Sequence, residues 1–203
     1  MDLINTEIFQ LLVSIAIGLG LAAACGFRVF LPLFLISLMS HLGFLHLAGT
    51  FEWMASLPAL IAFGSATVLE VIAYYVPFVD NLLDTVATPA AILAGALAMM
   101  TQVGDHNPLM AYSLAAVAGA GAAGAVQGLT TITRHLSSLA TAGFGNPILA
   151  TAEAGFSIVL SLAAIFVPLV ALAAVLALLY FAARALFGSK QDPPGLAETS
   201  GPA

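Results

Sequence analysis

Continuous apolar stretches fill the chain between residues 8 and 187, and they restrict its fold more than any other feature. Of the 203 residues, 62% are hydrophobic and only 7% are charged. A hydrocarbon core about 30 Å thick is crossed by about 20 helical residues, and within lipid only helices and closed barrels satisfy every backbone polar group. Because the apolar runs do not alternate, the sequence predicts an all-α, polytopic integral membrane protein with about six spans.

Glycine and proline divide these stretches and predict broken helices. Residues 8–45 exceed one upright span, so we expect two helical pieces separated near Gly26-Phe27-Arg28 and Pro32. Residues 41–56 are of mixed polarity, as is typical of a short interfacial segment. A proline in the first turn is typical of a helix start, and Pro168 predicts a tight bend. The expected starts are Pro58, Thr88-Pro89, Asn107-Pro108 and Asn146-Pro147.

Small residues recur at every fourth position in two of the predicted helices. This spacing lets helix backbones approach closely, so we predict helix-packing faces, and it also allows a homodimer. The second stripe follows the first at an offset of 102 residues, which favours an internal duplication with halves 8–103 and 107–187. Two halves of three crossings would lie inverted across the membrane. The stripes are Gly18, Ala22 and Gly26, and Ala120, Gly124 and Gly128.

Four ionisable residues, Arg28, Glu70, Arg134 and Glu153, lie within or beside the apolar stretches. A charge at the centre of a bilayer costs roughly 2.5–3.5 kcal/mol on insertion scales, so such residues face protein or a watery cavity. Arginine keeps its charge and serves as a fixed cation. We therefore expect Arg28 and Arg134 to pair with Glu70 or Glu153, or to bind an anionic solute.

Two further polar groups extend this candidate site. The first lies on one face of a helix and is typical either of a polar seam against a neighbouring helix or of the lining of a solute path. It comprises Gln127, Thr130, Thr131, Arg134 and Ser138. The second is Glu70 with Asp80 and Asp84, which would share one arc if a helix continued through Pro77; alternatively the two aspartates lie in a solvated loop. Asn146 completes the set of pathway candidates.

Several classes of function find no support in the sequence. The net charge of −6 and the absence of a basic cluster argue against nucleic acid as a partner. A single cysteine, Cys25, excludes an intrachain disulfide, and no metal-ligand spacing is present. We find no catalytic motif and expect neither an enzyme nor a cofactor. Arg184 and Lys190 flank the last span, so the C-terminus is predicted to be cytoplasmic, with residues 188–203 a disordered polar tail after one membrane domain, 1–187.

The order of these residues resembles the bacterial membrane family called domain of unknown function 4126, over about residues 10–187. The resemblance rests on Gly26-Phe27-Arg28, Glu70, Pro77, Asp80, Asp84, Pro89, Arg134, Asn146 and Glu153. The chain departs from the pattern where Tyr74 and Tyr75 replace an acidic-basic pair, Thr88 a basic residue, Thr130 a lysine and Ala154 an acid. The resemblance implies shared fold and site positions, and no activity.

Three functions are compatible with this sequence. The leading hypothesis is an inner-membrane transporter or channel-like protein for an unidentified ion or small solute, with coupling to protons as one form of it. The second is a structural or assembly protein whose buried charges only fix helix pairing. The third, a lipid-handling protein, requires a cavity that opens sideways to the bilayer beside the polar groups.

Overall fold

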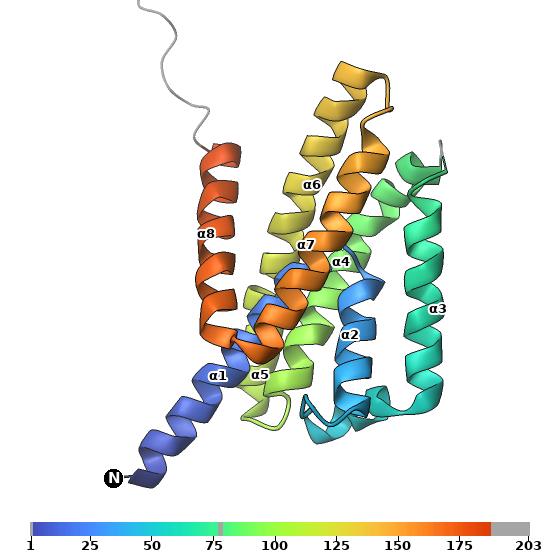
Figure 1. Cartoon of the computed structure of the whole chain (residues 1–203). Helices are drawn as coiled ribbons and strands as arrows, with labels where there is room; N and C mark the ends of the chain where they lie inside the picture. Colours follow the sequence, from blue (N-terminus) through green and yellow to red (C-terminus); the bar gives the residue numbers. More distant parts are fainter. Residues whose placement is uncertain (1, 77–78, 188–203) are drawn as a thin grey trace, which may run out of the picture.

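Helices make up all the regular structure in the part of the chain that the computed structural model describes, residues 2–76 and 79–187. Side chains are described for residues 5–76, 83 and 85–184. The all-α prediction is confirmed there. The elements are α1 (Asp2–Cys25), α2 (Phe30–His41), the 3₁₀ helix η1 (Gly49–Ala55), α3 (Leu57–Ala73), α4 (Val79–Val103), α5 (Pro108–Ser113), the π-helical η2 (Leu114–Gly119), α6 (Ala120–Thr141), α7 (Asn146–Phe166) and α8 (Pro168–Phe187) (Figure 1).

Four of the described helical segments are long and apolar enough to cross a membrane. They are Asn5–Cys25, Thr85–Val103, Pro108–Thr141 and Asn146–Phe166. The pair η1 and α3 passes the same test together, although the chain bends by 68° between them. Helix α2 and the segment Pro168–Arg184 of α8 are apolar but shorter. These lengths indicate a multi-pass membrane protein; six crossings and an inverted repeat stay predictions.

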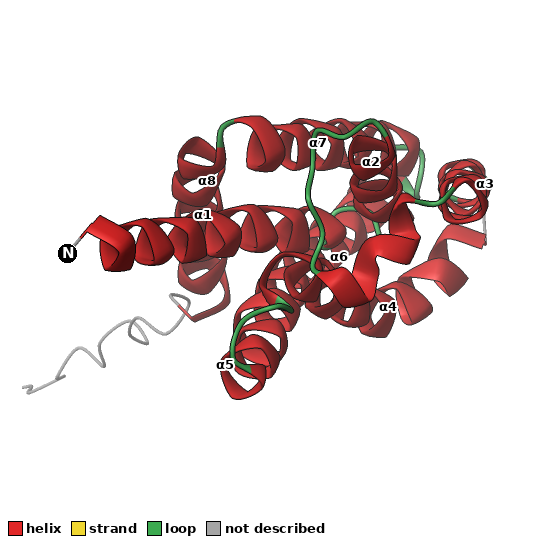
Figure 2. Ribbon diagram, turned by 90° about the horizontal axis from the view of Figure 1, so that it is seen from below, coloured by secondary structure: helices red, strands yellow, loops and turns green. Residues whose placement is uncertain are grey.

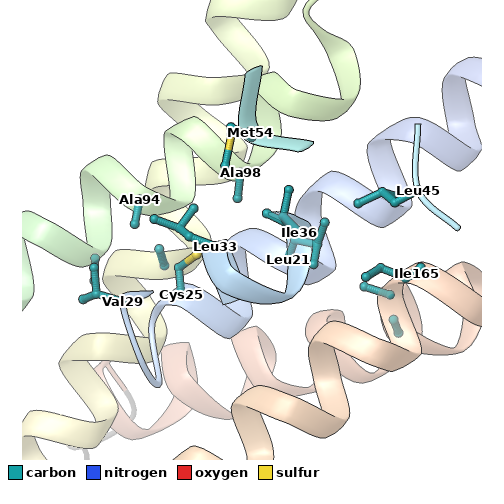
Figure 3. Packing of buried hydrophobic residues seen from close by; sticks show 14 residues of the cluster. Leu21, Cys25, Val29, Leu33, Ile36, Leu45, Met54, Ala94, Ala98 and Ile165 are labelled. Carbon is teal, nitrogen blue, oxygen red and sulfur yellow. The ribbon is translucent and has the colours of Figure 1, made fainter. Parts of the chain in front are cut away.

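Helix α1 lies at the centre of the bundle, where its second half packs against α4, α6, α7 and α8 (Figures 1 and 2). The largest apolar cluster joins Leu21 and Cys25 of α1 to Ile36 of α2, Ala98 of α4 and Ile165 of α7 (Figure 3). The side chain of Met54, on η1, belongs to the same cluster. The hydroxyl of Ser37 on α2 also donates a hydrogen bond of 2.6 Å to the Met54 carbonyl, so η1 is held against α2.

Most of the predicted helix boundaries are confirmed. The break after α1 spans residues 26–29, and α8 begins at Pro168. At the start of α5, the Asn107 carboxamide accepts hydrogen bonds from the amides of Leu109 and Met110, at 3.0 and 3.4 Å. An asparagine at this position satisfies amides that have no partner within the helix. Asn146-Pro147 also opens α7, where no side chain among the described residues caps the helix.

Two predictions around α4 are wrong. Thr88-Pro89 does not start a helix, because α4 begins at Val79 and contains Pro89 in its interior. Proline removes one backbone donor from a helix, but neighbouring helices compensate for this in membrane bundles, and the α4 face around Ala91 and Ala94 is buried in the core. The alternative of a solvated loop for Asp80 and Asp84 is also wrong, because both residues lie on α4. They do not share one helix with Glu70, since α3 ends at Ala73.

The two small-residue stripes differ in what they pack against. A Cβ atom at Gly18 would come within 2.5 Å of the Met99 sulfur, and one at Gly26 within 2.5 Å of the Ala123 carbonyl oxygen. Ala22, between them, is fully buried. In the second stripe, Ala120 is half-buried, a Cβ at Gly124 would meet only Ile92, and one at Gly128 would meet nothing within 4 Å. Close approach of α4 and η2 occurs instead at Gly95 and Gly119.

Gly26→Ala should therefore destabilise the protein, whereas Gly128→Ala should not. The added methyl group at Gly26 meets backbone that cannot move aside, which costs about 1–3 kcal/mol. At Gly128 the space is open and alanine favours helix by up to about 1 kcal/mol. Thermal unfolding of both variants in detergent measures the difference, and equal midpoints would contradict the packing described for α1.

Candidate functional site

Arg28, Arg134 and Glu153 form a buried charge cluster where the α1–α2 break meets α6 and α7. Their exposed fractions are 2%, 4% and 6%. The Nε of Arg134 donates to Glu153 Oε1 at 3.0 Å, and its Nη2 donates to Oε2, so this ion pair is bidentate. Nη2 of Arg28 lies 3.7 Å from the same Oε2. One carboxylate is thus shared by two guanidinium groups.

Tyr74 contacts both arginines of the charge cluster with its ring. The guanidinium carbon of Arg28 is 3.9 Å from the centre of the Tyr74 ring, and that of Arg134 is 4.2 Å from it. Cations are attracted to the negative face of an aromatic ring, so the ring offsets part of the repulsion between two neighbouring positive charges. In the sequence, Tyr74 stands out only as a departure from the family pattern; its position four residues after Glu70 was the available signal.

Glu70, on α3, holds the start of α2. Its carboxylate is buried and accepts hydrogen bonds from the backbone amides of Val29, at 2.7 Å, and Phe30, at 3.0 Å. The first amides of a helix have no partner within it, and negative charge is stabilised beside them. Glu70 of α3 therefore caps the neighbouring helix α2. Of the two expected glutamate partners for the arginines, Glu153 forms the ion pairs.

The α1–α2 break is also tied to α7 by two further hydrogen bonds. Nη2 of Arg28 donates to the Ala150 carbonyl at 2.7 Å, and the Ser157 hydroxyl donates to the Ala24 carbonyl at 3.1 Å. Two other nitrogen atoms of Arg28, Nε and Nη1, are buried and have no hydrogen-bond partner among the described residues. Guanidinium N–H groups act only as donors, so these two favour an acceptor such as an anion or water.

The polar stripe of α6 lies partly against protein. Gln127 and Thr130 are buried and Thr131 is half-buried. The Thr130 hydroxyl donates to the Gln127 carbonyl at 2.9 Å, within the same helix. Ser138 lies one turn after Arg134 on α6, and its hydroxyl accepts a hydrogen bond of 3.1 Å from Nδ2 of Asn146 on α7. The stripe therefore faces α7 at its Arg134 end.

The remaining predicted site residues, Asp80 and Asp84, lie on the first turns of α4. Their side chains lie outside the described residues. Among the side chains that are described, no group of three or more His, Cys, Asp or Glu is placed to hold a metal ion. The chemistry that the charge cluster offers is thus that of two fixed cations around one carboxylate, which is suited to binding an acidic group.

Glu153→Gln should lower the free energy of unfolding by about 3–5 kcal/mol, because it leaves buried arginine charges without their shared anion. Glu52→Gln is the matched control, since Glu52 is exposed on η1, and it should change stability by no more than about 0.5 kcal/mol. Chemical denaturation in detergent measures both. The cluster would be energetically unimportant if the two variants unfolded alike.

Glu70→Gln should loosen the start of α2, because an amide keeps only one acceptor oxygen for two backbone amides and removes the negative charge. Hydrogen exchange measured by mass spectrometry should show faster exchange in a peptide covering residues 26–34 and unchanged exchange in α8. A cost of about 1–3 kcal/mol corresponds to roughly a 5- to 150-fold loss of protection. Unaltered exchange at residues 26–34 would argue against capping by Glu70.

Comparisons with known proteins give one match. Searches of curated proteins and of solved structures find no match to this chain. The family model described as "Domain of unknown function (DUF4126)" matches residues 15–187, which contain the charge cluster, Tyr74 and Glu70. Since the match covers most of the chain, the protein belongs to the family with this domain of unknown function.

Proposed function

We propose that the protein moves a small anionic solute or ion across a bacterial inner membrane, and that the charge cluster lies on its path. The observation that carries this proposal is the gathering of Arg28, Arg134 and Glu153 in the interior of an apolar bundle. Ionisable residues at membrane depth typically mark ion or substrate paths. Their position beside a broken helix is also typical of transporter sites.

The anionic character of the solute follows from the chemistry of the two arginines. Both remain charged at any physiological pH, and two nitrogen atoms of Arg28, Nε and Nη1, have no acceptor among the described residues. An incoming carboxylate, phosphate or halide would accept hydrogen bonds from these two nitrogens, while Glu153 contacts Nη2 of the same guanidinium group. If one solute anion leaves the site as another enters, the net charge of the site is the same before and after each transport cycle.

The membrane arrangement in this proposal is multi-pass, with the C-terminus in the cytoplasm. In Figure 1, α3, α5–α6 and α8 run in one direction along the bundle and α4 and α7 run in the opposite direction, so these helices would supply alternating crossings. Helices α1 and α2 run up and back before them, so α1 is parallel to α3. Either exchange of anions or coupling to protons is compatible with this arrangement.

Transport is tested by reconstituting the protein in liposomes and measuring currents on a solid-supported membrane after jumps in chloride, phosphate or acetate. A pH-sensitive dye inside the liposomes reports proton movement in parallel. Arg28→Met should reduce the current at least tenfold, equivalent to about 1.4 kcal/mol, and Arg28→Lys should retain part of it. Arg184→Met, which removes an exposed arginine on α8, should leave the current unchanged.

Two outcomes would contradict a transport role. One is the absence of current and of proton movement above that of empty liposomes, for every ion tested. The other is an equal current in the wild type and in a folded Arg28→Met variant. Loss of stability in that variant without any flux in the wild type would instead favour the structural role of the charges.

A further inference from the structure

A pocket of about 410 Å³ lies beside the charge cluster, between α3, α4 and the start of α2. Each long wall is one helix face, with lining residues spaced at i, i+3, i+4 and i+7. Helix α3 stands at the edge of the bundle in Figure 1, so the pocket lies between an outer and an inner helix. The two walls are Ala66, Leu69, Glu70 and Ala73 on α3, and Leu83, Val86, Ala87 and Ala90 on α4.

The mouth of this pocket opens on the apolar outer surface. Its rim includes Leu69 and Val86, which are 67% and 60% exposed, and Phe30, which is 38% exposed. In a multi-pass membrane protein such a surface meets hydrocarbon rather than water. The medium that reaches the mouth is therefore the acyl-chain region of the bilayer.

The walls offer almost nothing to a polar ligand. Glu70 and Tyr74 are the lining side chains with polar atoms, and both are already engaged. The two oxygens of Glu70 accept hydrogen bonds from the amides of Val29 and Phe30, and the Tyr74 ring contacts Arg28 and Arg134. A polar molecule would lose its hydration without gaining new hydrogen bonds, whereas a methylene chain would lose nothing by entering.

We propose that one acyl chain of a bilayer phospholipid occupies this pocket while its headgroup stays at the membrane surface. A helix from a second copy of the chain, about 10 Å in diameter, is too wide for a space of this volume. Phospholipid, in contrast, is the solvent at the mouth and is always present. This inference is independent of the transport proposal, since a lipid can bind whether or not an anion moves.

A lipid at this position would support the site from outside. Helix α3 rests mainly on α2 and η1 and barely touches α4, although it carries Glu70 and is followed directly by Tyr74. A chain between α3 and α4 fills the gap that would otherwise remain behind these two residues. Occupancy of the pocket then stabilises both the cap of α2 and the contact of the Tyr74 ring with the arginines.

Brominated phospholipid provides a direct test, because bromine quenches tryptophan fluorescence only at contact range. Trp53 is the single tryptophan of the chain, so Trp53→Phe gives a silent background. Val86→Trp places a reporter at the rim and Leu93→Trp a control on the exposed surface of the same helix. Detergent micelles containing a rising fraction of phospholipid with brominated chains are then titrated against each variant.

We expect half-maximal quenching of the Val86→Trp reporter at a roughly tenfold lower lipid fraction than that of the Leu93→Trp reporter, equivalent to a preference of about 1.4 kcal/mol for the pocket over the general surface. Ala66→Phe fills the pocket and should abolish this difference, as should Ala90→Phe from the opposite wall. Ala62→Phe, on α3 but outside the pocket, should preserve it. Thermal unfolding identifies variants that remain folded.

Equal titration curves for the two reporters in protein without a pocket-filling substitution would overturn the proposal. So would a difference that persists in folded Ala66→Phe and Ala90→Phe variants. Selective quenching by brominated free fatty acid, with none by brominated phospholipid, would assign the pocket to a different ligand. Quenching that disappears on dilution of the protein would show that a second copy supplies the binding surface.

Discussion

The shared carboxylate of Glu153 is the interaction on which the arrangement of this bundle depends. Burying a single charge in a bilayer costs roughly 2.5–3.5 kcal/mol, and here two arginines are buried together. Glu153 meets both, through a bidentate pair with Arg134 and a 3.7 Å contact with Arg28. Because the three residues come from the α1–α2 break, α6 and α7, their pairing fixes how these segments meet.

The second constraint is the end of α1 and the start of α2. A helix that ends inside a membrane leaves carbonyl groups without partners, a helix that begins there leaves amides without partners, and no water is available to satisfy either. The carboxylate of Glu70 supplies the missing acceptor, and Arg28, within the break, donates to the Ala150 carbonyl. The broken helix and the charges thus depend on each other: the break positions Arg28, and Glu70 makes the break tolerable. Tyr74, one turn after Glu70, completes the enclosure of the arginines.

Much of this fold was predictable from the sequence because lipid imposes simple rules. Long apolar runs predicted helices, and Asn107-Pro108, Asn146-Pro147 and Pro168 marked real helix starts. The prediction at Pro89 was wrong because local rules place a proline at a helix terminus, whereas α4 packs against the core and keeps Pro89 in its interior. The charges of Arg28, Arg134 and Glu153 identified the cluster. The choice of Glu153 as their partner, the capping role of Glu70 and the place of Tyr74 depend on contacts between distant segments, which residue spacing does not encode.

An experimental structure of the protein in a lipid nanodisc, with side chains resolved around Glu153, tests the central claim most directly. We expect both arginines to approach this carboxylate inside the bundle, with the Tyr74 ring in contact with both guanidinium groups. Arginines that extend separately to the headgroup region, with Glu153 in contact with bulk water, would contradict it.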